Sequence, residues 1–177
     1  MAFKKSFTRS LTHIIFQPGR AKKKFLNKYC SKISSKKILE IGSGKKVNGK
    51  FIYSTADFFR KNNNKVVLSD ANPQFGHKVV DITKSCPKGY DVIVCFSVLE
   101  QIFDFHSAIK NMHKSLKKNG QLVVLVPAFY PLHDEPYDYW RFTEHSLRKL
   151  FSTFSKIEVD YYGKREFPYF YFIVAAK

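Results

Sequence analysis

A short apolar run that ends in two closely spaced glycines has the residue types of a small-molecule binding site. Residues 38–44 read ILEIGSG, which predicts a buried strand followed by a tight turn. Gly42 and Gly44 let the backbone adopt positive φ and approach a ligand closely, because no Cβ stands in the way. Glu40 interrupts the run, and a carboxylate near a buried strand end is costly unless it is paired. These residues predict a ligand site at the carboxyl end of the first strand.

The elements that must position this loop alternate along the chain. Helix-period and strand-period patterns follow one another, and Thr143 predicts the N-cap of a late helix. The predicted elements are a helix face through Phe51, Ile52, Ala56, Phe58 and Phe59, strands at 65–69 and 78–81, a buried strand at 90–96, a helix at 103–116, a strand at 121–126, and two last strands at 156–162 and 169–176. This alternation predicts a doubly wound α/β sheet that binds ligands at the carboxyl ends of its strands.

Length and composition indicate one globular domain. The chain has 177 residues, of which 44% are hydrophobic, and no apolar stretch approaches the ~20 residues that a membrane-spanning helix needs. Its three cysteines, Cys30, Cys86 and Cys95, show no spacing typical of metal ligands. We therefore expect reduced thiols in a cytoplasmic protein and no metal site.

The positive charge is concentrated at the amino terminus. Residues 1–37 carry eleven Lys or Arg and no acidic residue, out of a net charge of +17 for the chain. Residues 1–35 are predicted to form a basic helical arm, because apolar residues recur at helical spacing before Pro18 and a second helix is expected at 21–34. The apolar residues are Phe3, Phe7, Leu11, Ile14 and Ile15. Such an arm either lies on an anionic membrane surface, binds nucleic acid, acts as an organellar transit peptide or docks on its own domain. A general lysine bias explains the charge equally well.

Two common nucleotide-binding patterns do not fit the glycine loop. A phosphate-binding P-loop needs a glycine where this chain has Leu39 and a serine or threonine where it has Lys46. A dinucleotide fingerprint needs a third glycine, which is missing, and an acidic residue about 20 positions on, whereas Asp70 lies further away.

Residues 36–177 instead resemble the class I S-adenosylmethionine-dependent methyltransferases. The resemblance is carried by ILEIGSG, by Asp70 in VVLSDAN, by the strand and turn at 90–102, and by LKKNGQL at 116–122. The segment PLHDEPYDYWRFT, residues 131–143, is similar to a signature of a small bacterial subgroup of type-11-like methyltransferases. Lys46 departs from the family pattern, because many members have a third glycine there.

This resemblance implies a fold and a cofactor. The fold is a Rossmann-like seven-stranded sheet, mostly parallel with an antiparallel last strand and with helices on both faces, in a single domain over 36–177. The cofactor is S-adenosylmethionine, whose ribose hydroxyls would be bound by Asp70, whose adenine would lie beside Asp81 and Ile82, and whose amino end would face Glu40. The residues expected to bind it are Glu40, Gly42, Ser43, Gly44, Asp70, Ala71, Asp81, Ile82, Phe96 and Ser97.

Catalytic candidates follow the fifth strand. Methyl transfer is an in-line displacement, so positioning supplies most of the catalysis, and a base is needed only when the acceptor must lose a proton. His133 is the predicted base, Asp138 would orient it or bind substrate, and Arg141 would hold an acidic group of the substrate. In the alternative interpretation Asp138 and Arg141 simply pair, and the aromatic residues around them belong to the core.

The acceptor is predicted mainly by exclusion. The turn at 96–99 lacks the Asn/Asp-Pro-Pro-aromatic motif of enzymes that methylate base amino groups, and Cys95 lies inside a strand rather than in a catalytic loop. The resemblance implies O- or N-methylation of a small-molecule or glycan-type acceptor, in the cytoplasm and peripheral to the inner membrane face if the arm binds membrane. Two alternatives stay open, a non-enzymatic binding module and an RNA or protein methyltransferase, each using the basic arm to hold an anionic partner.

Overall fold

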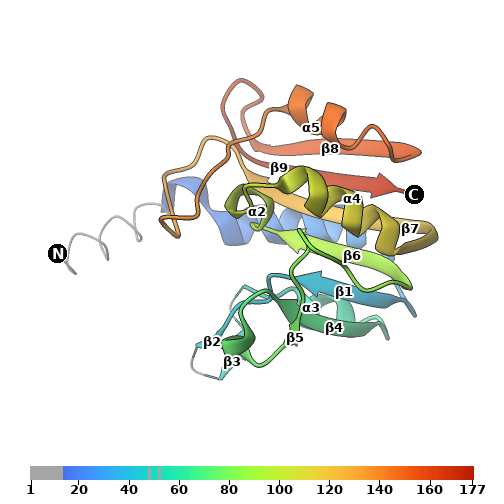
Figure 1. Ribbon diagram of the computed structural model, residues 1–177. Helices are drawn as coiled ribbons and strands as arrows, with labels where there is room; N and C mark the ends of the chain where they lie inside the picture. The colour runs from blue at the N-terminus through green and yellow to red at the C-terminus, as the bar shows by residue number, and fades with distance from the viewer. Residues whose placement is uncertain (1–13, 48, 52) are drawn as a thin grey trace.

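A seven-stranded sheet with strand order β5-β4-β1-β6-β7-β9-β8 forms the centre of the computed structural model, which describes residues 14–47, 49–51 and 53–177 (Figure 1). Strands β5, β4, β1, β6 and β7 are parallel, and β9 is antiparallel to both β7 and β8. The strands are β1 (Lys37–Ile41), β4 (Lys65–Asp70), β5 (Lys78–Val79), β6 (Tyr90–Phe96), β7 (Leu116–Pro127), β8 (Lys156–Gly163) and β9 (Pro168–Ala176). This confirms the predicted sheet and its antiparallel last strand.

The central strands are buried on both faces, which explains their continuous apolar sequences. In β6, residues 92–95 are all buried, and in β1 Ile38 and Leu39 are completely inaccessible to solvent. A parallel sheet covered by helices on both sides selects such runs rather than an alternation of apolar and polar residues. The alternating partly buried pattern of β8, at the sheet edge, is the contrasting case.

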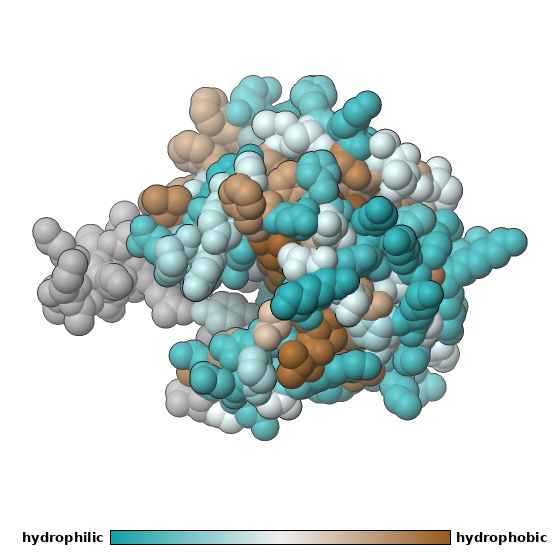
Figure 2. Space-filling view, viewed as in Figure 1, coloured by the Kyte–Doolittle hydropathy of each residue, from teal (hydrophilic) through white to brown (hydrophobic). Residues whose placement is uncertain are grey.

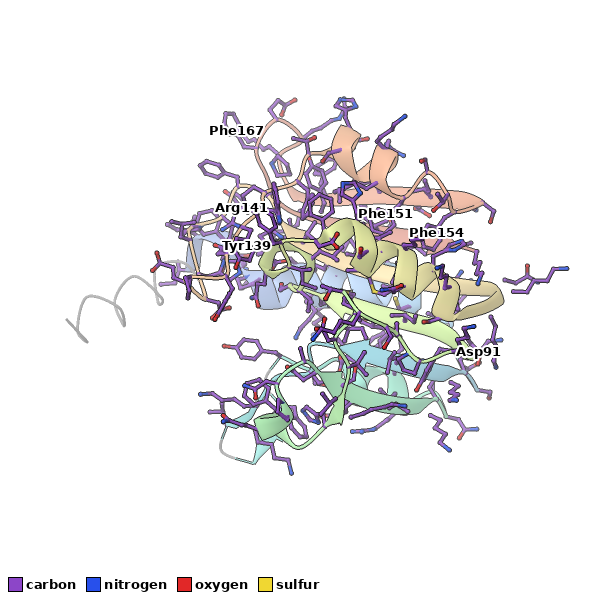
Figure 3. All side chains as sticks on the ribbon, viewed as in Figure 1. Asp91, Tyr139, Arg141, Phe151, Phe154 and Phe167 are labelled. Carbon is purple, nitrogen blue, oxygen red and sulfur yellow. The ribbon has the colours of Figure 1, made fainter. Side chains whose placement is uncertain are left out.

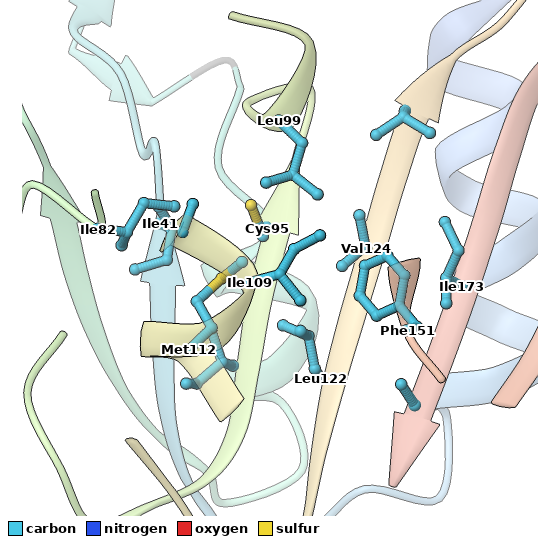
Figure 4. Close-up of a cluster of buried hydrophobic side chains, with 14 of the residues drawn as sticks. Ile41, Ile82, Cys95, Leu99, Ile109, Met112, Leu122, Val124, Phe151 and Ile173 are labelled. Carbon is cyan, nitrogen blue, oxygen red and sulfur yellow. The ribbon is translucent and has the colours of Figure 1, made fainter. Parts of the chain in front are cut away.

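Helices cover both faces of the sheet. On one face, α4 (Phe105–Ser115) and α5 (Glu144–Leu150) pack through Ile109, Met112 and Leu147 against β6, β7 and β9 (Figure 4). On the other face lie α2 (Pro18–Phe25), the π-helical turn η1 (Leu26–Cys30) and α3 (Ala56–Arg60), and the Phe25 ring stacks on Phe172 of β9 at 4.7 Å. Two short 3-10 helices, η2 (Pro73–Phe75) and η3 (Leu99–Gln101), follow β4 and β6.

Several predicted boundaries differ in the structure. The strand predicted at 121–126 extends over Leu116–Pro127, and the helix predicted at 103–116 spans Phe105–Ser115. Pro18 was expected to break a helix, but it occupies the first turn of α2, where its missing N–H has no intrahelical partner to lose. Phe51 was expected on a helix face, but it lies in a small hairpin of β2 (Lys46–Val47) and β3 (Lys50–Phe51), and α3 begins only at Ala56. The predicted cap at Thr143 is confirmed, with a reciprocal pair of hydrogen bonds to Ser146.

Part of the predicted arm lies outside the described residues, including Phe3, Phe7 and Leu11. Of its described part, Ile14 and Ile15 are exposed, whereas Ala21 and Phe25 are fully buried against the sheet. Within the described ranges, every helix is too short or too polar to cross a bilayer. The three cysteines are free, as expected.

Candidate functional site

The loops that follow β1, β4, β6 and β7 meet at one end of the sheet, because these strands are parallel neighbours. This end lies at the left in Figure 1, and the side-chain view places Tyr139 and Arg141 there and Asp91 at the opposite end (Figure 3). The predicted cofactor loop and the predicted catalytic residues therefore lie at the same end.

The glycine loop adopts a backbone that other residues tolerate poorly. Gly42 has φ 70° and Gly44 has φ 68°, both in the left-handed region. A Cβ on Gly42 would fall inside van der Waals contact of Val98 Cγ2, in the turn after β6, and a Cβ on Gly44 would lie 3.2 Å from the Tyr53 ring. The two glycines thus leave a bare backbone surface between the turns after β1 and β6.

Glu40 organises the chain around this loop. Its side chain is 4% exposed and accepts hydrogen bonds from the Ser43 hydroxyl, the Ser54 hydroxyl, and both the backbone N–H and the hydroxyl of Thr55. Four donors satisfy a buried carboxylate that would otherwise be costly. Glu40 thereby ties the hairpin segment to the end of β1, and its contact with a cofactor amino group stays a prediction.

Asp70, at the end of β4, clamps the same loop from the other side. One carboxylate oxygen accepts the Gly44 N–H at 3.0 Å and the other accepts the Asn72 N–H at 2.9 Å. His77 Nε2 is hydrogen bonded to the Gly44 carbonyl at 2.8 Å, a contact that sequence reasoning missed. Ala71, next to Asp70, is exposed, so this carboxylate and the adjacent backbone border the open end of the sheet.

The remaining predicted cofactor residues lie after β5 and at the end of β6, and only Ile82 among them is buried. Asp81 accepts hydrogen bonds from the Thr83 hydroxyl and backbone, which lower the pKa of the Asp81 carboxyl, and Ile82 is buried in the core. Phe96 packs on Phe172, with ring centroids 5.6 Å apart. Ser97 has φ 52° and donates its N–H to the Leu125 carbonyl, which directs the following Val98 towards Gly42.

Asp138 and Arg141 form a bidentate ion pair, which is the structural alternative that the sequence left open. The Arg141 Nη1 and Nη2 atoms lie 2.6 and 2.7 Å from the two Asp138 oxygens. Arg141 also donates to the carbonyls of Tyr130, Pro131 and Trp140, so all five of its N–H groups have acceptors. Burial opposes ionisation, but the Arg141 guanidinium holds the pKa of Asp138 below its usual value. A substrate acid would have to displace one of these acceptors to reach Arg141.

His133 lies between two carboxylates. Its Nδ1 atom is 3.1 Å from Asp138 Oδ2, and its Nε2 atom is 3.6 Å from Glu100 Oε1. Burial works against the charged imidazole, yet Glu100 and Asp138 together raise the pKa of His133. The base that the sequence predicts is thus the neutral imidazole, which forms only as the pH rises through this raised pKa.

Glu100 is the site residue that sequence reasoning missed. It lies in η3, its side chain is fully buried, and neither carboxylate oxygen has a hydrogen-bond partner among the described residues. Burial raises the pKa of the Glu100 carboxyl, and the facing His133 opposes that shift. The one available signal was an acid in the otherwise apolar turn Val98-Leu99-Glu100, directly after a buried strand.

We predict that Glu100→Gln lowers the pKa of His133. The neutral amide removes one of the two negative charges that face the imidazole, so the midpoint of the His133 titration should move towards its ordinary value near 6.5. NMR titration of the ring carbons measures this directly in the ligand-free protein. The contribution of the His133 ion pairs to the free energy of unfolding should be fully present below pH ~6.5 and should be lost as the pH rises through the raised pKa of His133.

His113 is the internal control for this titration. Burial and Lys177 lower its pKa, and its ring packs edge-on against Phe154 with centroids 4.7 Å apart. The His113 midpoint should stay the same in the variant. An unchanged His133 midpoint would contradict the inferred coupling between Glu100 and the imidazole.

Comparisons with known proteins agree with this arrangement. A family model described as a methyltransferase domain matches residues 13–158. The probable polyketide synthase 6 of Dictyostelium discoideum is 28% identical over 79 residues, a match that covers 42% of this chain and 3% of that much longer protein.

Two solved structures illustrate the similarity in fold. The crystal structure of a SAM dependent methyltransferase from Archaeoglobus fulgidus shares 14% identity and a TM-score of 0.67, over 88% of this chain and 92% of that chain. Phosphoethanolamine N-methyltransferase 2 of Haemonchus contortus, in complex with S-adenosyl-L-methionine, shares 12% identity and a TM-score of 0.64, over 87% of this chain and 51% of that chain. Together with the family match over most of its length, the strand order and the glycine loop show that this chain belongs to the methyltransferase-domain family.

Proposed function

We propose that this protein transfers a methyl group from S-adenosylmethionine to a hydroxyl or amino group of a small-molecule or glycan-type acceptor. The observation that carries the proposal is the bare glycine backbone at the carboxyl end of β1, held by Asp70 of β4 and facing Val98 after β6. It lies at the switch point between β1 and β6, since the chain continues from β1 to β4 on one side and from β6 to β7 on the other, and doubly wound folds bind their ligands at this position.

The residues present fit the cofactor. S-adenosylmethionine is the cofactor of this enzyme, and it supplies an activated methyl group on a sulfonium with no phosphate to bind. The Gly42 and Gly44 backbone permits the close approach that such a ligand needs, since a side chain at position 42 would fill the space. Asp70 offers carboxylate oxygens at the edge of this space for hydroxyl donors. Phe96, Ser97, Ala71, Asp81 and Ile82 complete the proposed cofactor site.

On the acceptor side, we assign the proton-accepting role to His133 and positioning roles to its neighbours. Asp138 faces Nδ1 and fixes the ring plane, while Arg141 neutralises Asp138 and braces the loop through three backbone carbonyls. With a hydroxyl acceptor, the neutral His133 imidazole would take the acceptor's proton. An amine acceptor that arrives unprotonated needs the same positioning but loses its proton after the transfer.

The acceptor class is supported by resemblance and by a similar enzyme. The segment at 131–143 is similar to a signature of the small bacterial subgroup named above. The similar Haemonchus enzyme is named a phosphoethanolamine N-methyltransferase, after a small-molecule acceptor. We propose that the protein acts in the cytoplasm on a metabolite or a glycan precursor.

Calorimetric titration with S-adenosylmethionine tests the proposal. The unaltered protein should bind it, and Asp70→Ala should weaken binding by at least about tenfold, equivalent to about 1.4 kcal/mol. Asp91→Ala is a matched control, because Asp91 also accepts one backbone N–H, from Lys37, but lies at the opposite end of the sheet. If the well-folded protein did not bind S-adenosylmethionine, the proposed enzymatic activity would be rejected and the non-enzymatic binding module would be favoured.

A further inference from the structure

Exposed large apolar side chains gather at the end of the molecule that carries the candidate site. In the described ranges there are ten, and each follows the carboxyl end of a strand or contacts a segment that does. They are Ile14, Ile15, Tyr53, Val79, Phe103, Phe129, Leu132, Tyr137, Tyr139 and Phe167. The opposite end of the sheet has none of them, so this distribution is a property of one end and not of the whole surface.

We group four of these side chains, Ile14, Ile15, Phe129 and Phe167, and call them the apolar ridge. Their exposed fractions are 69%, 48%, 58% and 62%. The buried Phe16, which directly follows Ile14 and Ile15 in the chain, links the two parts of the ridge, because its ring lies 6.2 Å from the Phe129 ring, which in turn lies 6.0 Å from the Phe167 ring. Brown atoms at the upper left of Figure 2 mark this end, where the side-chain view labels Phe167 (Figure 3).

Basic residues flank the apolar ridge. Arg20 is exposed in α2, and Lys164 and Arg165 are exposed just before Phe167. Glu166 is the acid within this group, and Arg165 also lies 3.6 Å from Glu144. The residues that precede Ile14 in the sequence carry further positive charge, and the first acidic residue of the chain is Glu40. The acids Asp134 and Glu135 lie beside Leu132 and mark the boundary of the ridge on that side.

From this combination we propose that the apolar ridge and the basic residues around it dock the protein on an anionic lipid bilayer. Convex apolar side chains can enter the interface of a bilayer while flanking Lys and Arg contact anionic headgroups. A second copy of the chain is a poor occupant, because each copy carries a net charge of +17 and the two would repel. A single-stranded nucleic acid needs aromatic faces on a basic groove, whereas half of the ridge is aliphatic.

Docking in this orientation turns the candidate site towards the lipid headgroups. Phe129 belongs to the loop after β7, and its neighbour Tyr130 packs against the His133 ring at 5.4 Å. The acceptor would then be a molecule presented at the membrane surface, such as a lipid-linked one. This last step rests on the proposed function, but the docking itself does not.

Co-sedimentation of the full chain with lipid vesicles tests the proposal without cofactor or acceptor. We expect binding to vesicles that contain phosphatidylglycerol, weak binding to pure phosphatidylcholine, and weaker binding as salt is added. Replacing both Phe129 and Phe167 with serine should lower the partition coefficient by about tenfold or more. The matched control replaces Val79 and Phe103 with serine. These two residues are similarly exposed at the same end but lie outside the ridge, so the partition coefficient of this variant should stay within about twofold of that of the unaltered protein.

Each other outcome would overturn the proposal. An equal loss of vesicle binding in both double variants would mean that the ridge has no special role in docking. If the unaltered protein did not sediment with any vesicles, the membrane-docking proposal would be rejected. A concentration-dependent dimer or a bound RNA that disappears only in the Phe129 and Phe167 variant would assign the ridge to that partner instead. Thermal melting shows whether each variant is folded, and titration with S-adenosylmethionine reports separately on the proposed function.

Discussion

Arg141→Met is expected to lower the free energy of unfolding by about 3–5 kcal/mol at neutral pH, because it removes the permanent positive charge that pairs with a buried carboxylate and leaves it only its contacts with His133. The Asp138 side chain is 1% exposed and receives both terminal nitrogens of Arg141. Methionine keeps most of the apolar stem but supplies no charge and none of the five hydrogen bonds. Equilibrium unfolding in urea, followed by circular dichroism, measures the change.

Arg148→Met is the matched control for this experiment. Arg148 pairs with Glu144 at 2.9 Å on the surface of α5, where its side chain is 46% exposed. A solvent-exposed pair of this kind contributes about 0.2–1 kcal/mol, so the control should unfold nearly like the unaltered protein. Equal, small effects of both substitutions would show that the Asp138 pair is not the brace we infer.

The double variant Asp138→Asn with Arg141→Met separates two costs, that of losing the ion pair and that of leaving a buried carboxylate unpaired. Removing both partners leaves no unpaired carboxylate, so it should cost less than Arg141→Met alone. The pH dependence has a defined sign. Because the pKa of Asp138 is lowered in the folded state, the stability from this pair is present above the ordinary Asp value near 3.9 and is lost as the pH falls through the lowered pKa.

Gly42→Ala is expected to be the most damaging small substitution for cofactor binding. Alanine in the left-handed region costs about 1–2 kcal/mol, and crowding against Val98 adds about 1–3 kcal/mol. Val98 is β-branched and turns away only with difficulty. We expect the affinity for S-adenosylmethionine to fall by about tenfold or more, because the methyl group fills the bare backbone surface. Calorimetric titration and urea unfolding measure the two effects.

Gly89→Ala measures the left-handed backbone strain alone, without a clash like the one that Val98 causes in Gly42→Ala. Gly89 has φ 89°, and a Cβ there would meet nothing within 4 Å. It precedes β6 at the end of the sheet remote from the glycine loop. The control should therefore show the strain of about 1–2 kcal/mol with unchanged cofactor affinity. If Gly89→Ala impaired cofactor binding as strongly as Gly42→Ala, the loop at 42–44 would not be the cofactor site.

How well the sequence predicts the structure differs from residue to residue. The helix cap at Thr143 was predictable because a capping residue acts on its own neighbours, within three positions. The role of Pro18 was misjudged because proline both ends helices and begins them, and only the packing of α2 decides between the two. For Asp138 and Arg141, a spacing of three allowed either pairing or substrate binding, and the enclosing loop carbonyls decided for pairing.

By itself, the sequence determined the order and type of the main elements and the position of the glycine loop at the end of β1. These depend on apolar periodicity and on glycines next to a buried strand, which are local properties of the chain. Only the tertiary structure revealed Glu100 facing His133, His77 bonded to the Gly44 carbonyl, and the apolar ridge of Ile14, Ile15, Phe129 and Phe167. The partners in these contacts are 33 or more residues apart, and one ridge joins both ends of the chain. No local pattern encodes which distant segments the parallel strands bring to one end of the sheet.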